Sequence, residues 1–214
     1  MADRRSSGRG RLGRALLGGF ALALACAGPS VPAETPADPE VFQIDVAHSS
    51  AGFKVRHLFN QTTGRFTDFT GALQYDPARP ENSSIEITIR AASIDTANEN
   101  RDNHLRGSDF FDVEKHPTIV FRSTKIEPTD QENRYRVTGD FTMLGVTRPI
   151  VVTVDALGFA DLPGMGYRGG FSATATINRK DFGMQWNKLL DAGGTLLGDD
   201  VQVEFPLQVV RQSP

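Results

Sequence analysis

The chain has 214 residues, of which 39% are hydrophobic and 23% are charged, and its formal net charge is −3 at pH 7. This length allows one domain with its own core, and the single cysteine excludes an internal disulfide. Without the first 27 residues, which carry five Arg and one Asp, the charge falls to −7, which argues against a nucleic-acid partner.

The first 27 residues have the features of a secretory signal peptide. Five arginines precede an apolar stretch at 15–27 that is too short to span a bilayer. Ala25 and Ala27 provide a small-x-small cleavage site, and 31–33 provides a second one. We therefore expect a periplasmic or secreted protein with a signal peptide at 1–27, a disordered spacer at 28–40 and one folded domain at 41–212.

Cys26 permits a second interpretation of this N-terminus. A cysteine after an apolar run can be the lipidated first residue of a bacterial lipoprotein, although Leu24 lies one place too close to it for the usual pattern. Anchoring through Cys26 therefore stays open as an alternative. No later segment is apolar enough to cross a membrane, so we expect no transmembrane span in the mature chain.

Alternating apolar residues predict β-strands along the whole domain. The period of two is clearest in four segments, at 85–89, 150–156, 171–177 and 201–209. Further strands are predicted at 42–47, 52–55, 65–75, 118–126 and 135–141. Short turns at 127–133 and 144–147 favour antiparallel pairing of sequential strands. The sequence therefore predicts an all-β fold, an antiparallel barrel of about eight strands with one or two short helices.

Two segments interrupt this pattern. Polar residues dominate 97–106, which we expect to form a short helix that caps or crosses a barrel mouth. The segment 184–200 has neither period, yet it contains the only Trp, Trp186, and four leucines around Gly193 and Gly194. Loops with this apolar content pack inward or cover something. We interpret the segment as a lid or a homodimer contact.

Catalytic and metal-binding patterns are weak in this chain. The four histidines do not have the spacing that places two ligands on one face. His48 and His57 are readily explained by hydrogen bonds to the backbone at strand ends, and His116 by a turn before Pro117. Ser172 lies within a predicted strand, and the segment 170–174 lacks the second of the two glycines that flank the serine in a nucleophile elbow. Asp181-Phe182-Gly183 has no accompanying phosphate loop, so it predicts only a strand-terminating turn. We predict no catalytic residue, metal or cofactor.

Residues 101–104 form the densest polar cluster, and two interpretations stay open. The segment can be a surface helix with balanced charges. Alternatively, Arg101 or His104 faces the barrel mouth and contacts a polar or anionic head group.

The apolar residues are more informative. The chain has fourteen Phe against three Tyr and one Trp, and phenyl groups line a cavity without leaving polar atoms unpaired. A small barrel can be filled by its own side chains or hold one apolar ligand, and this composition suits both.

The order of the turn and strand motifs resembles the YceI-like family of bacterial lipocalin-like barrels. The resemblance covers about residues 42–210 and rests on Asp45, His48-Ser49, Phe53, His57, Gly64, Phe66, Gly71, Ile94-Asp95-Thr96, 101–105, Phe110-Phe111-Asp112, Pro117, Phe121, Gly139, 144–147, Asn178-Arg179, Asp181-Phe182-Gly183 and Gly198-Asp199. It implies an extended barrel whose apolar tunnel holds a polyisoprenoid, such as a prenyl quinone or prenyl phosphate.

The predicted ligand-binding residues combine this resemblance with the predicted strands. Phenylalanines within strands are expected to line the tunnel, and the others to close or flank its mouth. The set is Phe53, His57, Phe66, Arg101, His104, Leu105, Phe110, Phe111, Phe121, Phe141, Phe171 and Trp186.

Three functions are consistent with these features. The leading hypothesis is extracytoplasmic binding and sequestration or transport of an isoprenoid lipid. The first alternative is a non-catalytic interaction or envelope-stress module whose barrel is filled by its own side chains. The second alternative is an enzyme acting on an isoprenoid, which would require titratable groups such as His57 and Asp102 to converge on the tunnel.

Overall fold

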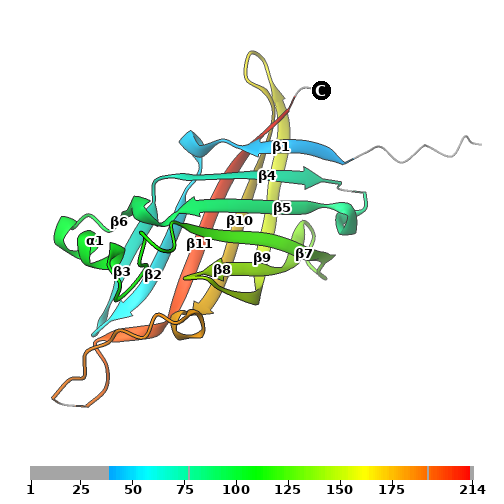
Figure 1. Ribbon diagram of the computed structural model, residues 1–214. Coiled ribbons are helices and arrows are strands. Elements are labelled where there is room, and N and C mark those ends of the chain that lie inside the picture. Colours follow the sequence, from blue (N-terminus) through cyan, green and yellow to red (C-terminus); the bar gives the residue numbers. More distant parts are fainter. Residues whose placement is uncertain (1–38, 77, 192, 213–214) are drawn as a thin grey trace, which may run out of the picture. The chain divides into compact units, whose positions relative to one another are not determined.

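The computed structural model describes residues 39–76, 78–191 and 193–212 (Figure 1). The predicted signal peptide, Cys26 and all but the last two residues of the predicted spacer lie outside these ranges. The described strands are β1 Glu40–Ile44, β2 Ala51–His57, β3 Asn60–Phe66, β4 Phe69–Tyr75, β5 Ser84–Arg90, β6 Ile94–Asp95, β7 Thr118–Pro128, β8 Arg134–Met143, β9 Val146–Leu162, β10 Gly166–Asn178 and β11 Leu197–Arg211. The described helices are α1 Glu99–Arg106 and four 3-10 turns, η1 Val46–His48, η2 Pro80–Asn82, η3 Ala91–Ser93 and η4 Arg179–Phe182.

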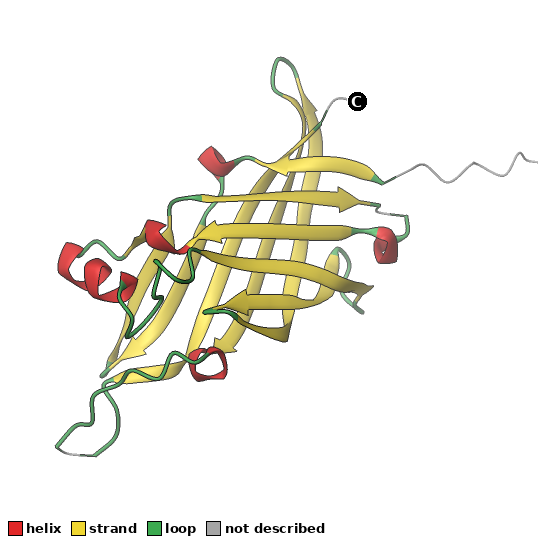
Figure 2. Cartoon of the chain, viewed as in Figure 1, coloured by secondary structure: helices red, strands yellow, loops and turns green. Residues whose placement is uncertain are grey.

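The strands form a closed antiparallel barrel of eight rows (Figure 2). Sequential pairing runs from β4 through β5, β7, β8, β9 and β10 to β11, and β1 closes the barrel by pairing with both β4 and β11. β2 continues the row of β1 along the same edge of β11, β3 continues the row of β4, and β6 continues the row of β5. The predicted all-β barrel of eight strands is therefore confirmed.

The predicted single strand at 65–75 is wrong in its bounds. The strand begins earlier, at Asn60, and is broken at Asp68 into β3 and β4. Asp68 bends the row because its carbonyl accepts from the Arg90 backbone N–H, at 2.9 Å, while its carboxylate accepts from the Arg90 side chain, also at 2.9 Å. Breaks at neighbouring positions in the adjacent rows, marked by η1 and η3, change the strand direction near one end of the barrel.

The helix is shorter than predicted. Ala97 has a left-handed φ of 58°, and the Asn98 side chain accepts a hydrogen bond from the Arg101 N–H, so α1 begins at Glu99 rather than at 97. It lies over one end of the barrel, beside β6 and β3 (Figure 1). None of the helices in the described ranges is long and apolar enough to cross a membrane.

A bulge in β9 decides which side chains enter the other end of the barrel. Phe171 of β10 faces Ala156 and Gly170 faces Gly158, so Leu157 is an extra residue without a partner. Before the bulge the even-numbered residues of β9 point inward, as Val152 and Val154 do; after it, the odd-numbered Phe159 does. A one-residue bulge reverses the alternation of a strand, and that reversal places Phe159 inside the barrel.

Asp45, at the break between β1 and β2, ties three rows together. Its Oδ2 accepts hydrogen bonds from Arg168 Nη1 at 2.5 Å, from His48 Nδ1 at 3.0 Å and from Gln208 Nε2 at 3.4 Å. The hydrogen bond from Arg168 holds the pKa of Asp45 below its usual value of 3.8. Asp45 therefore joins β10 and β11 at the point where the first row bends.

We predict that Gly145→Val lowers the free energy of unfolding by roughly 1–3 kcal/mol, because Gly145 has a φ of 73° that β-branched residues rarely adopt. Chemical denaturation measures the effect. Gly145→Asn is the matched control and should lose less, since Asn tolerates this region. Equal losses, or an unchanged midpoint for Val, would contradict the role of the backbone angle.

We predict that Asp45→Asn lowers the free energy of unfolding at pH 7 by roughly 1–2 kcal/mol. Because the folded-state pKa is depressed, the stabilisation by the carboxylate is fully present above the unfolded-state value near 3.8 and is lost as the pH falls through the lower folded-state pKa. The difference between wild type and variant should therefore be constant at neutral pH and shrink below about pH 4.

Denaturation curves recorded from neutral to acid pH test this. Asp161→Asn is the control, because Asp161 is exposed and forms no ion pair with a described residue. A difference between wild type and Asp45→Asn that persists undiminished into acid would show that the ion pair with Arg168 is not what stabilises the bend.

Candidate functional site

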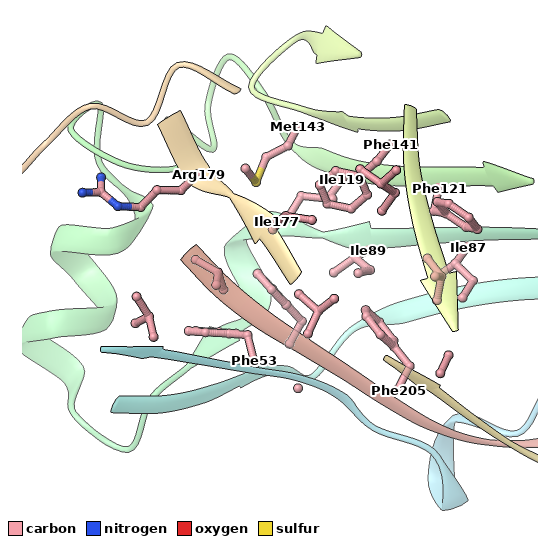
Figure 3. Close-up of a pocket in the computed structure, with 18 of the residues that line it drawn as sticks. Phe53, Ile87, Ile89, Ile119, Phe121, Phe141, Met143, Ile177, Arg179 and Phe205 are labelled. Carbon is pink, nitrogen blue, oxygen red and sulfur yellow. The ribbon is translucent and has the colours of Figure 1, made fainter. Parts of the chain in front are cut away.

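An internal cavity of about 340 Å3 lies within the barrel (Figure 3). Its wall is almost entirely apolar and receives side chains from all eight rows. All twelve residues predicted from the sequence lie along it, while their contact with a ligand stays a prediction. The strands add aliphatic and aromatic residues that the sequence analysis did not single out: Leu73, Tyr75, Ile85, Ile87, Ile89, Ile119, Tyr135, Val137, Met143, Ile150, Val152, Val154, Ile177, Val201, Val203, Phe205 and Leu207.

Two glycines explain why the phenyl rings leave space in the barrel. Gly64 lies directly across from Phe53 in the β2–β3 ladder, and a Cβ at Gly64 would be only 2.3 Å from the Phe53 ring. A Cβ at Gly139 would likewise lie 2.5 Å from the ring of Phe121. Each ring therefore lies against the backbone of a neighbouring strand instead of crossing the interior.

A column of aromatic rings closes the end of the cavity that is distant from α1. The ring of Tyr75, which lines the cavity, stacks on Phe159 with centroids 5.1 Å apart, and Phe159 stacks on Tyr167 at 5.9 Å. The guanidinium of Arg211 covers Tyr167, 4.6 Å from the ring centroid. Phe159 belongs to this column because of the bulge in β9.

Two tyrosine hydroxyls lie at this closed end, which Ser83 also lines. The hydroxyls of Tyr75 and Tyr135 lie 3.4 Å apart, a long hydrogen bond that leaves each oxygen free to accept another. Burial raises the pKa of Tyr75 well above its usual value of 10. This end of the cavity therefore offers neutral hydrogen-bonding groups and no charge.

The opposite end, near α1, is the mouth of the cavity. There the His104 ring meets Phe110 and Trp186 edge to face, with centroids 5.0 and 5.2 Å away. Asp109 Oδ2 lies 3.1 Å from His104 Nε2 and orients the imidazole. Trp186 of the segment 184–200 thus packs against the mouth, while residues 197–200 of that segment belong to β11. Its role as a lid or a homodimer contact stays a prediction.

The polar cluster at 101–104 is bonded mainly to Thr96. The Arg101 guanidinium donates to the Thr96 hydroxyl at 2.8 Å and to its carbonyl at 2.7 Å. Asp102 is buried and accepts from the N–H and the hydroxyl of the same residue. No hydrogen bond joins His57 to Asp102 in the described chain, so this geometry does not bring together the two groups that the enzyme hypothesis requires.

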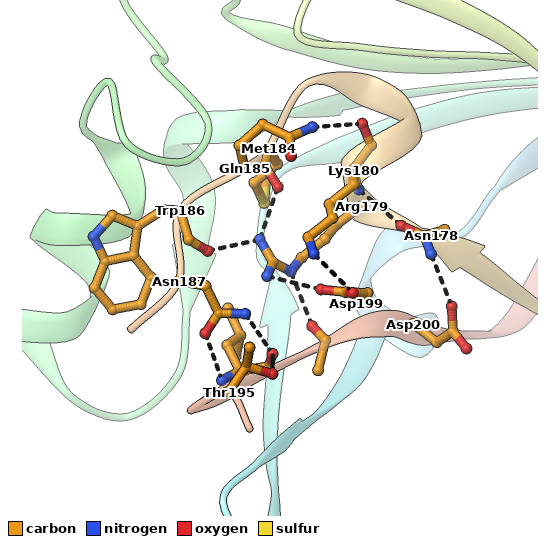
Figure 4. A network of polar contacts seen from close by, with 12 residues as sticks. Asn178, Arg179, Lys180, Met184, Gln185, Trp186, Asn187, Thr195, Asp199 and Asp200 are labelled. Atoms are coloured by element: carbon orange, nitrogen blue, oxygen red, sulfur yellow. Dashed lines mark hydrogen bonds and ion pairs between the residues drawn. The ribbon is translucent and has the colours of Figure 1, made fainter. Parts of the chain in front are cut away.

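Arg179 is a buried cation at the mouth, a motif residue that the sequence analysis named but did not include in the predicted site (Figure 4). Its guanidinium donates to the carbonyls of Met184, Trp186 and Gly198 at 2.7 to 2.9 Å, and it pairs with Asp199 at 3.2 Å. Burial lowers the pKa of Arg179 from its usual value. The residue therefore fixes the start of the 184–196 segment against β11 and holds Trp186 in place.

No three His, Cys, Asp or Glu side chains gather as a metal site would require within the described residues. The described buried side-chain nitrogen and oxygen atoms all have hydrogen-bond partners. The chemistry that this arrangement supports is therefore the burial of an apolar molecule, with a few neutral or positively charged groups at its two ends.

Comparisons with known proteins agree with this geometry. The model of the family described as YceI-like domain matches residues 42–209. A UPF0312 protein of Azotobacter vinelandii is 37% identical over 175 residues, which cover 81% of this chain and 84% of that protein. The crystal structure of Burkholderia cenocepacia BcnA is 27% identical with a TM-score of 0.69 and covers 77% of this chain and 98% of BcnA.

A third match shows the fold alone. A polyisoprenoid binding domain from Saccharophagus degradans is 14% identical to this chain with a TM-score of 0.59, over 80% of this chain and 98% of that domain.

We predict that Gly64→Ala reduces the cavity and lowers the free energy of unfolding by roughly 1–3 kcal/mol, because the new methyl group displaces the Phe53 ring into the interior. A crystal structure of the variant and its thermal unfolding measure the two effects. Gly170→Ala is the control, since its Cβ would make only ordinary contacts at 3.5 Å. An unmoved Phe53 ring would contradict the prediction.

Proposed function

Because this chain belongs to the YceI-like family, we propose that it binds an isoprenoid lipid in the barrel cavity and sequesters or carries it outside the cytoplasm. The candidate ligands are a prenyl quinone and a prenyl phosphate. The observation that carries the proposal is the apolar cavity of about 340 Å3 inside a closed barrel. The polyisoprenoid binding domain from Saccharophagus degradans, which has the same fold, supports the same class of ligand.

The size of the cavity limits the buried length of such a ligand. A cavity of about 150 Å3 lined by apolar side chains holds one benzene molecule, so 340 Å3 accommodates about fourteen carbon atoms, or about three isoprene units. Each unit removed from water contributes roughly 2–4 kcal/mol before the cost of ordering the chain. Binding is therefore driven by the chain, and the head group sets its orientation.

The polar groups at the mouth favour a head group at that end. His104 and Arg101 both line the cavity there, and a chain that entered tail first would leave its polar head beside them. The aromatic column at the other end stops the tail. The family and the geometry therefore support the binding of an isoprenoid chain. The cavity of about 340 Å3 disfavours the alternative of a barrel filled by its own side chains.

The first experiment identifies the natural ligand. The protein expressed from its full-length sequence is extracted with organic solvent, and mass spectrometry compares the extract with a mock purification. A stoichiometric isoprenoid supports the proposal. The proposal would be contradicted by a stable protein that carries no lipid and takes up neither prenyl quinones nor prenyl phosphates. The better hypothesis would then be the non-catalytic interaction module.

We predict that affinity increases by about tenfold or more with each isoprene unit up to about three units and then levels off. Quenching or shift of Trp186 fluorescence reports binding, because the only Trp of the chain lies at the mouth. Phe159→Ala, which removes the middle of the aromatic column, should move the plateau to longer chains. A continued rise in the wild type, or an unmoved plateau in the variant, would contradict the closed end.

A further inference from the structure

The turn between β2 and β3 has a composition that is unfavourable in water. A two-residue hairpin turn normally contains Asn, Asp or Gly, but here it consists of Leu58 and Phe59. Leu58 has a left-handed φ of 53°, and the Phe59 side chain is fully exposed. Leu58 is partly buried, but the fully exposed Phe59 ring beside a left-handed leucine at a hairpin tip points to contact with something outside the chain.

A second apolar tip lies beside the first. Leu189, in the 184–196 segment, is 79% exposed. The two tips are joined through their backbones, because the Leu58 N–H donates to the Leu196 carbonyl at 2.8 Å and Leu197 pairs with His57. In Figure 1 the β2–β3 end and the 184–196 segment project together at the lower left, on the side of α1.

Both tips border the mouth of the cavity. His57, Trp186 and Leu196 line the cavity. His57 is two residues from Phe59, Trp186 is three residues from Leu189, and Leu196 accepts the hydrogen bond from the Leu58 N–H. Phe59 and Leu189 themselves do not line it. A surface that bound these tips would therefore face the mouth without obstructing the interior.

Positive charge flanks the tips of a domain that is otherwise acidic. Arg56 is exposed and donates only to the Leu58 carbonyl among the described contacts, and Lys188 is exposed next to Leu189. Neither forms an ion pair with a described residue. Asp191 is the acidic residue near the tip of the same segment. Apolar tips with flanking cations match the interface of a bilayer with anionic head groups.

We propose that the β2–β3 turn and the tip of the 184–196 segment form a docking surface for a lipid bilayer that contains anionic lipids. Phe59 and Leu189 insert among the head groups, and Arg56 and Lys188 contact the phosphates. The cavity mouth then opens toward the membrane, where apolar molecules are dissolved. This surface goes beyond lipid binding in the cavity, and docking does not require the cavity to be occupied.

Vesicle co-sedimentation with the protein expressed from its full-length sequence tests the proposal, using phosphatidylcholine vesicles with and without phosphatidylglycerol. The wild type should bind vesicles that contain phosphatidylglycerol. Phe59→Ser with Leu189→Ser should lower the affinity by about tenfold or more for each side chain, because each loses the transfer of an apolar group out of water. Arg56→Gln with Lys188→Gln should weaken binding to the anionic vesicles and abolish its salt dependence.

The matched control is Leu157→Ser with Met165→Ser, which removes two exposed apolar side chains from β9 and the β9–β10 turn at the other end of the barrel. It should bind vesicles like the wild type. Circular dichroism and prenyl-ligand binding should be unchanged in the tip variant, so that a loss of docking is distinguished from a loss of folding or of cavity binding.

Three results would overturn the proposal. The first is a wild type that does not bind anionic vesicles, and the second is a tip variant that binds them as well as the wild type does. The third is a wild-type dimer in size-exclusion chromatography with light scattering that the tip variant converts to a monomer, since the tips would then contact a second copy of the chain.

Discussion

Closure of the sheet by pairing β1 with β11 is the constraint on which the rest of the structure depends. It removes the exposed edges of the eight rows and fixes an interior that is only wide enough for side chains or for one slender ligand. Whether that interior is filled then depends on a few residues. Gly64 and Gly139 let Phe53 and Phe121 lie against the wall, and the space that remains is the cavity.

The two ends of this interior are held by different interactions. At one end, stacked rings from β4, β9 and β10 form a plug that needs no hydrogen bonds apart from those of the tyrosine hydroxyls. At the other end, the buried guanidinium of Arg179 donates hydrogen bonds to backbone carbonyls of an irregular segment. Asn187 adds two hydrogen bonds with the backbone of Leu197, so this segment is held by a few polar contacts rather than by packed rings. Under the proposed function, the end held by polar contacts is the one at which a ligand would enter.

Much of this architecture could be predicted from the sequence because alternation is a local signal. Strands such as 85–89 and 201–209 place their apolar residues inside, and the turn residues around Gly145 mark a hairpin. The bulge at Leu157 was not predictable, since the register of β9 is decided by its partner β10. The role of Arg179 was not predictable for a similar reason: its four acceptors belong to residues 5 to 20 positions away that only the folded chain brings together. Aliphatic wall residues such as Ile87 show the same alternation in the sequence, but the predicted site included only phenylalanines from the strands.

The bulge in β9 also has an evolutionary consequence. The pairing with β10 holds on both sides of the extra residue, with Ala156 opposite Phe171 and Phe159 opposite Gly169. Deleting Leu157 would therefore remove the bulge and leave the Phe159 ring inside the barrel, whereas straightening the strand without a deletion would turn that ring outward. The closed end is thus tolerant of the loss of one codon at this point, and a relative that lacks the bulge can keep the same aromatic column.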